Sequence, residues 1–270
     1  MSPFNIVVFV KQVPDNTKLK PEQLTGNSLP KEGVDMIVNP FDEYALETAL
    51  RLKEAAGAEA QVTVISLGAA SAKEIVKKTI AAGADAAYLL SDPVFLSGDS
   101  TSVAYALSGA LKQLVPDAKI AVFGTLSLDA SDGQTGPKVA ELLDWASLTT
   151  CKNAEIVDLE TLNVWRETER GIEQYTMALP GVICMMKCDY ELRTANIKGV
   201  MKANKTEIPL KTPAELALEP ALVGAAVATS QSENVWPRPA KTAGIKVDGS
   251  ADAKAAVDKL IAYLRENKVL

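Results

Sequence analysis

The stretch GTLSLDASDGQTGP, residues 124–137, lies between the apolar run KIAVF (119–123) and the helix-like run VAELL (139–143). An apolar run of this length is typical of a strand buried on both faces. A strand, a glycine-rich turn and a helix in this order form the first half of a βαβ unit. The stretch therefore predicts a parallel sheet, with this turn beyond the carboxyl end of a strand.

The sequence before this stretch repeats the same alternation. We expect further strands at 5–10, 61–66 and 86–90, and helices at 42–56, at 71–82 and after Asp99, which can act as an N-cap. Strands that alternate with helices predict right-handed crossovers, and hence a Rossmann-like parallel sheet flanked by helices in the α/β class. Ligands of such sheets bind beyond the carboxyl ends of the strands.

The helix expected at 42–56 has a well-marked start. Asn39 can cap it, Pro40 suits the first helical position, and Asp42 stands three residues after the cap.

The pattern changes after Trp145. Residues 162–167 and 174–178 flank a turn at Arg170-Gly171, which predicts a β-hairpin insertion, and 181–187 is another apolar run. Beyond Asp189 the chain is rich in proline and has little periodicity until 251–267, which predicts an extended C-terminal arm ending in a helix. We therefore divide the chain into a nucleotide-binding α/β domain at 1–188 and a partner-binding part at 189–270.

Composition excludes several classes of protein. The chain has 270 residues, is 47% hydrophobic and carries a net charge of −6, which predicts a globular fold and disfavours nucleic-acid or anionic-membrane binding. No apolar run predicts membrane insertion, and the absence of a signal-like pattern leads us to expect a cytoplasmic protein.

Histidine is absent, which removes the commonest general base and metal ligand, so we expect no catalytic residues and no metal site. The cysteines Cys184 and Cys188 lie in a strand-like run and are expected to be structural thiols.

The opening stretch suits a nucleotide. Gly124, Gly133 and Gly136 permit close backbone approach, and Gln134 and Thr135 offer polar groups at the start of a helix, where free N–H groups can bind phosphate. The stretch is neither a Walker A loop nor GxGxxG, and its residues could instead form only a loop and a cap.

Two carboxylates in the stretch allow a different interpretation. Asp129 and Asp132 could be metal ligands or an acid–base pair, but carboxylates in a loop of this kind are more often hydrogen-bond acceptors.

Several separate motifs together resemble one family. They are KQVPD (11–15), NPFDEYALETALRLKE (39–54), GAD (83–85), DGQTGPKVAELL (132–143), RTANIKGVMKANKTEIP (193–209) and TAGIKVDG (242–249). In this order they cover essentially the whole chain, which resembles the β (small) subunit of electron-transfer flavoproteins.

The resemblance implies an electron-carrier subunit that pairs with an α subunit. It implies AMP held in a Rossmann-like β subunit, and a redox FAD that lies mainly on α. The positions that match the family's nucleotide site are Phe9, Asn39, Pro40, Phe41, Asp42, Leu67, Gly124, Asp129, Asp132, Gly133, Gln134 and Thr135.

The resemblance also implies partner-binding residues. Ile197, with Arg193 nearby, matches a recognition loop that docks a flavin-containing dehydrogenase such as an acyl-CoA dehydrogenase, and Glu167 matches a glutamate that faces the α subunit. The chain departs from the family at Thr125 and Leu126, where a basic residue and a glutamine are usual.

Three alternatives remain open. Electron-bifurcating members of the family bind a second FAD in β in place of AMP and use the helix start near 97–101, which SGDST matches in part. A different class of protein, an ATP-using enzyme on the same fold, would need a phosphate-loop lysine or an acid–base set that the sequence does not show. A ligand-free scaffold is the third.

Overall fold

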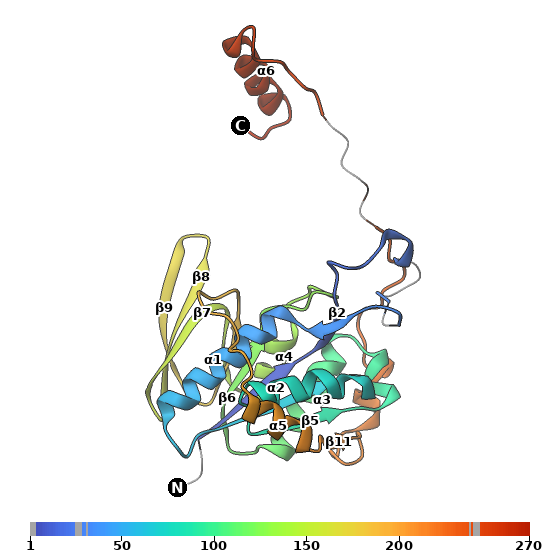
Figure 1. Ribbon diagram of the computed structural model, residues 1–270, viewed down its shortest axis with the longest axis vertical. Helices are drawn as coiled ribbons and strands as arrows, with labels where there is room; N and C mark the ends of the chain where they lie inside the picture. The colour runs from blue at the N-terminus through green and yellow to red at the C-terminus, as the bar shows by residue number, and fades with distance from the viewer. Residues whose placement is uncertain (1–3, 25–28, 31, 238, 240–243) are drawn as a thin grey trace. The chain divides into compact units, whose positions relative to one another are not determined.

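The apolar runs of the sequence become the strands of one large sheet (Figure 1). The computed structural model describes residues 4–24, 29–30, 32–237, 239 and 244–270. Among these residues the strand order of the sheet is β11-β5-β4-β1-β6-β10-β7-β8-β9. The strands from β11 to β7 pair in parallel, whereas β7, β8 and β9 are antiparallel. The mixed α/β fold and its hairpin confirm the predicted Rossmann-like class.

The strands of this sheet have the following bounds: β1 Asn5–Val10, β4 Gln61–Leu67, β5 Ala86–Leu90, β6 Ala118–Gly124, β7 Ala146–Asp158, β8 Thr161–Thr168, β9 Gly171–Ala178, β10 Gly181–Met185 and β11 Leu210–Lys211. Two short strands, β2 Gln12–Pro14 and β3 Met36–Val38, form a separate antiparallel pair.

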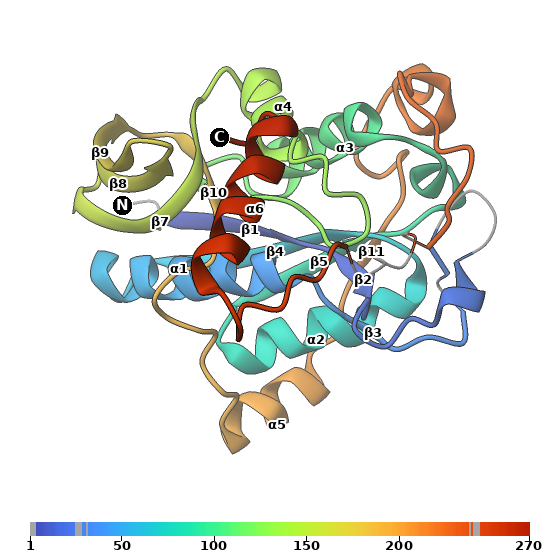
Figure 2. The ribbon, with the colours of Figure 1, turned by 90° about the horizontal axis from the view of Figure 1, so that it is seen from above.

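Helices cover both faces of the parallel part of the sheet. They are α1 Pro40–Ala56, α2 Lys73–Ala82, α3 Ser100–Leu114 and α4 Thr135–Leu143. Two further helices are α5 Ile197–Lys205, which packs against α2, and α6 Ala253–Glu266 near the C-terminus. Short 3₁₀ turns occur at Pro21–Gln23, Ala70–Ala72, Pro93–Ser97, Pro220–Leu222 and Gly224–Ala226. Figure 2 shows α1 and α2 on one face of the sheet and α3 and α4 on the other. This two-sided cover is what right-handed crossovers produce when the chain order reverses within a sheet.

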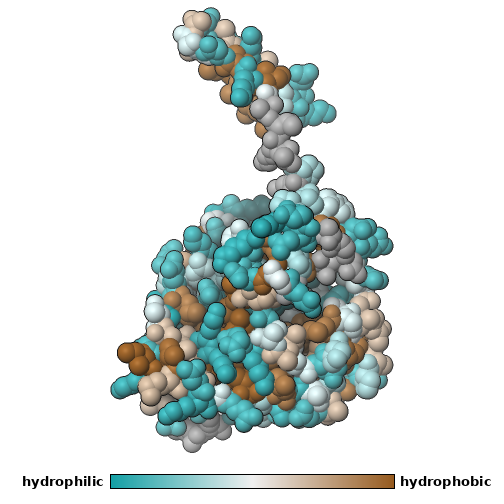
Figure 3. Space-filling view, turned by 45° about the vertical axis from the view of Figure 1, so that its right-hand side comes forward, coloured by the Kyte–Doolittle hydropathy of each residue, from teal (hydrophilic) through white to brown (hydrophobic). Residues whose placement is uncertain are grey.

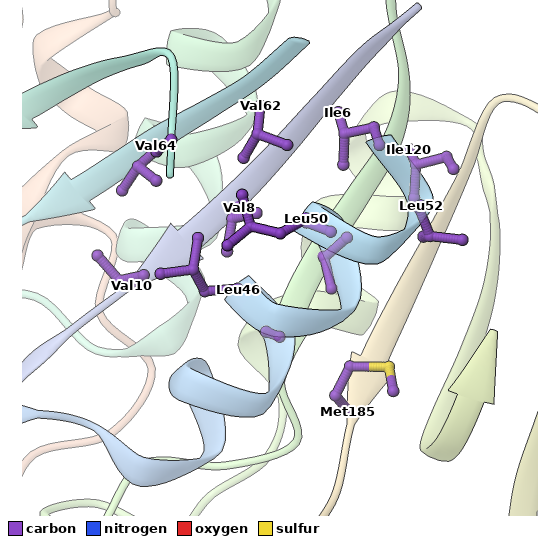
Figure 4. Packing of buried hydrophobic residues seen from close by; sticks show 14 of the residues in the cluster. Ile6, Val8, Val10, Leu46, Leu50, Leu52, Val62, Val64, Ile120 and Met185 are labelled. Atoms are coloured by element: carbon purple, nitrogen blue, oxygen red, sulfur yellow. The ribbon is translucent and has the colours of Figure 1, made fainter. Parts of the chain in front are cut away.

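The core has one apolar layer on each face of the sheet. Side chains of β1 alternate between them: Ile6, Val8 and Val10 pack toward α1, while Val7 and Phe9 pack on the side of α3. Figure 4 shows leucines of α1, including Leu46 and Leu50, directed at the β1 side chains. Burying one such aliphatic side chain stabilises the fold by about 1.5 to 3 kcal/mol.

Several elements differ from the sequence prediction. The short strands β2, β3 and β11 were not predicted. The long strand β7 was not predicted, because its pairing register shifts near Thr150, which has φ 56°, and its burial does not alternate cleanly. The recognition loop expected around Ile197 is the helix α5, whose N-terminus is capped by the Asn196 side chain accepting from the Gly199 backbone N–H at 2.8 Å.

The predicted start of α1 is confirmed in position only. The helix begins at Pro40 with Asn39 as its N-cap residue, but the Asn39 side chain makes no cap hydrogen bond. That side chain bonds to the loop after β6 instead.

The structure divides the chain at a different place from residue 188. Met1–Val235 form one unit and Trp236–Leu270 another. Residues 189–235 belong with the sheet because they supply apolar side chains to it. Leu216, Leu218 and Val223 are buried in the layer that contains α3, and the backbone of Gly109 leaves room for Leu218.

The second unit contains α6, as predicted. Its apolar side chains Val257, Leu260 and Tyr263 are exposed, and Figure 3 shows apolar and hydrophilic residues side by side on this helix. Among the residues described, no helix is both long and apolar enough to cross a membrane.

Candidate functional site

A cavity of about 570 Å³ opens at the carboxyl ends of β1, β4 and β6. Residues at the starts of α3 and α4 also line it. The strand order reverses between β1 and β6, because β4 and β5 lie on one side of β1 and β6 lies on the other. This is the place where open α/β sheets bind their ligands.

One wall of the cavity is apolar. The rings of Phe9 and Phe123 stack with centroids 4.3 Å apart, and Ile65, Leu67 and Val103 line the same space. Such a wall suits a flat ring system of low polarity.

Glycines bring the backbone close to this space. A side chain at Gly124 would overlap Asp42 and the backbone of Phe41, and one at Gly136 would overlap the sulfur of Cys184. Gly133 has φ 65°, which favours glycine. The glycines of the opening stretch are therefore required by the turn itself.

The start of α4 presents unpaired amide groups to the cavity. Thr135 and Gly136 line it and occupy the first turn of the helix, where N–H groups have no partner within the helix. Nearby, the Lys138 ammonium donates to Ser100 Oγ at 2.9 Å and to Thr101 Oγ1 at 3.0 Å at the start of α3. The first-turn amides of α4 are donors of the kind that can hold a phosphate group.

Asn39 ties the edge of the site together. Its Nδ2 donates to Asp42 Oδ1 at 2.9 Å and to the Leu126 carbonyl at 2.8 Å, while its Oδ1 accepts from the Leu128 N–H at 3.2 Å. The side chain thus joins the start of α1 to the loop between β6 and α4.

Asp42 is a buried carboxyl in the same cluster. Its Oδ2 accepts from the Lys11 backbone N–H at 2.7 Å. Burial raises the pKa of Asp42 to about 7, although hydrogen bonds from Asn39, Lys11 and Gly124 favour its ionised form.

Lys11 and Asp129 form an ion pair beside the cavity. Lys11 Nζ lies 2.7 Å from Asp129 Oδ1 and 3.4 Å from Ser127 Oγ. Burial opposes ionisation of Asp129, but the Lys11 ammonium outweighs it and lowers the pKa of this carboxyl.

The opposite wall comes from two segments distant in sequence. Gly98, Asp99 and Ser100 form the approach to α3, and Ser230, Ser232 and Val235 line the cavity from the end of the first unit. Asp99 Oδ1 caps α3 by accepting from the N–H groups of Thr101 and Ser102.

Most of the predicted nucleotide residues meet at this cavity. Those that line it are Phe9, Asn39, Asp42, Leu67, Gly124, Asp129, Asp132, Gly133 and Thr135. Pro40, Phe41 and Gln134 do not line it, although they adjoin residues that do. Residues 230–235 were missed because nothing in their composition indicates that they return to the sheet.

The predicted partner-binding residues lie in different settings. Ile197 is 81% exposed at the start of α5. The Arg193 guanidinium instead forms ion pairs within the chain, with Glu54 and with the buried Glu47, whose Oε2 lies 2.9 Å from Arg193 Nε. Glu167, at the end of β8, lies half exposed with Lys152 Nζ 3.5 Å from its carboxylate. The partner roles of these three residues remain predictions.

The cysteines are buried free thiols. Burial raises the pKa of Cys151 to about 12, and it raises that of Cys184 further. Within the part of the chain that the structure describes, no cluster of three or more cysteine, aspartate or glutamate residues is placed to hold a metal ion.

Several known proteins resemble this chain. The family model "Electron transfer flavoprotein domain" matches residues 28–216, which include α1, β4, α3 and the β6–α4 loop. The electron transfer flavoprotein subunit beta of Megasphaera elsdenii is 32% identical over 98% of this chain and 99% of its own length. That of Thermoanaerobacterium thermosaccharolyticum is 37% identical over 80% of this chain and 81% of its own. The protein FixA of Azotobacter vinelandii is 33% identical over 75% of this chain and 72% of its own.

The chain belongs to the electron transfer flavoprotein β-subunit family.

Membership in the electron transfer flavoprotein family confirms the resemblance drawn from the motifs. The matched region contains much of the cavity wall but neither β1 nor residues 230–235. The Megasphaera relative, in contrast, aligns over nearly the whole chain.

Proposed function

We propose that this chain is the β subunit of an electron transfer flavoprotein, which holds an adenine nucleotide in the cavity described above and pairs with an α subunit that carries FAD. The observation that carries the proposal is the cavity at the β1–β6 reversal, where most of the motif-matched residues meet. In this role the chain passes no atoms between substrates. It shapes and positions an electron carrier.

The residues of the cavity fit an adenine nucleotide. The apolar wall around Phe9 and Leu67 accommodates the base, and the first-turn amides of Thr135 and Gly136 are placed for phosphate oxygens. Asp132 and Thr135 offer acceptors and a hydroxyl for the polar edges of base and ribose.

AMP is the first candidate for this nucleotide, and a second FAD is the alternative. One observation favours FAD: the cavity extends beyond the β6–α4 loop to Gly98, Asp99 and Ser100. A longer dinucleotide would fill this extension, whereas AMP would leave it to water. FAD supplies reversible one- and two-electron transfer when bound, so its presence in β would make the chain a bifurcating type.

Pairing with an α subunit accounts for the second unit. Val257, Leu260 and Tyr263 on α6 are about half exposed, and Ile245 in the preceding arm is 82% exposed. Side chains of this kind are normally covered in the working protein. We propose that the α subunit covers them, and that a flavin-containing dehydrogenase donates the electrons.

The test is a cofactor count on the assembled pair. The chain is co-expressed with its α subunit, and the purified complex is denatured. FAD and AMP released per heterodimer are then measured by absorbance and chromatography. One FAD with one AMP supports the simple carrier, and two FAD support the bifurcating type. A complex that contains neither nucleotide in β, or a chain that binds no α subunit, contradicts the proposal.

A nucleotide-turnover assay tests the remaining alternative, an ATP-using enzyme on the same fold. An ATP-using enzyme would hydrolyse or transfer phosphate from ATP in the isolated chain, whereas a carrier subunit would not.

A further inference from the structure

The segment after β11 returns to the sheet and runs beside α3 (Figure 2). Three contacts along α3 and the turn before it hold this return. The Glu219 N–H donates to the Tyr105 hydroxyl at 3.1 Å, the Gly224 N–H to Ser102 Oγ at 2.6 Å, and the Ala225 N–H to Ser97 Oγ at 3.2 Å. Gly224 has φ 70° and packs against Val94, so the chain turns sharply there.

Beyond this turn, one carboxylate collects the remaining contacts of the segment. Asp99 Oδ2 accepts from the N–H of Thr229 at 2.8 Å and of Ser230 at 3.1 Å, and from their hydroxyls at 2.9 and 3.2 Å. Its other oxygen caps α3 at the same time. One side chain therefore joins a helix start, the cavity edge and the segment that passes over it.

The segment contributes to the cavity immediately after this contact. Ser230, Ser232 and Val235 line the cavity, whereas Thr229 does not. The wall built by residues 230–235 is otherwise exposed coil, so its position depends on the Asp99 contact.

We propose that residues 229–235 form the closing wall of the nucleotide cavity, and that the Asp99 carboxylate holds this wall in place and so limits how fast the nucleotide leaves. This inference rests on the proposed nucleotide-binding function. It assigns Asp99 as a positioning residue and the segment 230–235 as a ligand-contacting wall.

The test uses variants that separate the wall from the cap. In Asp99→Asn the remaining side-chain oxygen can still cap α3, but the amide NH₂ faces the donors of Thr229 and Ser230 and cannot accept from them. Thr229→Val removes one hydrogen bond from the wall without touching the cavity. Asp92→Asn is the matched control, because Asp92 caps the preceding 3₁₀ turn through Val94 and makes no contact with the wall.

Two measurements are made on the full chain. Hydrogen exchange of the peptide that contains residues 226–235 reports the wall itself and needs no ligand. Dissociation of radiolabelled AMP, and separately of FAD, reports nucleotide retention.

We expect faster exchange in Asp99→Asn and Thr229→Val, together with nucleotide release that is faster by about tenfold in Asp99→Asn and less in Thr229→Val. Asp92→Asn should behave like the unaltered chain. If hydrogen exchange of the 226–235 peptide is unchanged in Asp99→Asn, the contact of Asp99 with Thr229 and Ser230 does not hold the wall. Faster exchange with unchanged release overturns the role of the wall, as does faster release in Asp99→Asn alone with no effect of Thr229→Val. If the unaltered chain binds neither AMP nor FAD, the nucleotide proposal fails as well, and the exchange data still decide the Asp99 contact.

Discussion

Asn39 donates from its side-chain amide to the carboxylate of Asp42 at 2.9 Å, and the two side chains are only 1% and 6% exposed. The pair lies at the start of α1 and is hydrogen-bonded to two other segments: the Lys11 backbone just after β1, and Leu126 and Leu128 in the loop between β6 and α4. The polar groups of Asn39 are thus engaged within the chain, and their effect on the cavity is to fix the loop that lines it.

Replacing Asn39 with alanine should therefore destabilise the fold and loosen the site together. The change leaves the Leu126 carbonyl, the Leu128 N–H and one oxygen of Asp42 without their partner, at a cost of about 2 to 4 kcal/mol. Urea unfolding of the full chain measures this loss, and AMP or FAD affinity should fall with it. Asn153→Ala is the control, because its amide contacts only the exposed Glu155, and it should cost less than about 0.5 kcal/mol. Equal effects of the two changes would argue against this role for Asn39.

The buried Asp42 predicts a pH dependence of stability. Its pKa is about 7 in the folded chain against an ordinary value of 3.8 for an aspartate, so the folded state binds more protons than the unfolded state between these values. The free energy of unfolding should fall as pH rises from about 4 to about 7, with a slope of up to about 1.4 kcal/mol per pH unit. Carboxyls whose pKa is lowered, such as Asp129 and Glu47, act below this window with the opposite sign.

Asp42→Asn isolates this contribution. The variant should lose most of the decline between pH 4.5 and 7, measured by urea unfolding at several pH values. Glu43, whose pKa burial also raises, accounts for any small slope that remains. An unchanged slope would mean that Asp42 ionises normally in the folded protein.

Gly124 should not tolerate a side chain. A Cβ there would overlap the Asp42 carboxylate and lie 2.7 Å from the carbonyl carbon of Phe41. The carboxylate is held by Asn39 and Lys11, and the Phe41 atom is backbone, so neither can move away easily. Gly124→Ala should therefore cost about 1 to 3 kcal/mol and displace the loop that lines the cavity. Gly244→Ala offers the matched control, since nothing lies within 4 Å of a Cβ at that position. Thermal unfolding of both variants tests the prediction, which fails if they melt alike.

Patterns along the chain predicted the parallel part of the fold. Continuous apolar runs such as β1 and β6, followed by capped helices, carry a strong local signal because both faces of each strand are buried. The strand β7 carries a weak one, since it is half exposed and interrupted at Thr150.

The cavity was predictable to the extent that its residues follow strands. Thr135 and Asp132 lie in the turn after β6, where parallel sheets bind ligands. The wall at 230–235 depends on a contact between Asp99 and Thr229, which no local pattern indicates. Asn39 shows the same limit at shorter range. Its position is that of a cap, but the side-chain oxygen that would accept from the first turn of α1 accepts instead from the Leu128 N–H.

Arg193 should contribute to the stability of the chain, independently of its predicted role in docking a partner. Glu47 is buried, and although burial opposes its ionisation, Arg193 and Arg51 lower its pKa. Arg193→Ala should leave this carboxylate with Arg51 alone and cost about 2 to 3 kcal/mol, less than for a fully buried pair because the guanidinium is 34% exposed. A double-mutant cycle with Glu47→Gln should recover part of that cost. Lys254→Ala, which removes an exposed pair with Asp258, is the control and should change stability by less than about 0.5 kcal/mol.

Unlike Arg193, Ile197 should contribute little to the stability of the chain, because its side chain is 81% exposed. Ile197→Ala should leave the free energy of unfolding within about 0.5 kcal/mol of the unaltered protein. If the side chain anchors a flavin-containing dehydrogenase, the apparent KM for that dehydrogenase should rise about fivefold or more in the assembled α/β complex, while the nucleotide content stays constant. Leu159→Ala provides the control, since it also shortens an exposed aliphatic side chain, in the turn between β7 and β8, that is assigned to no binding surface. A rise in KM confined to Ile197→Ala assigns the docking contact to α5. An equal rise in both variants, or none in either, removes Ile197 from the docking surface and leaves its exposure without that explanation.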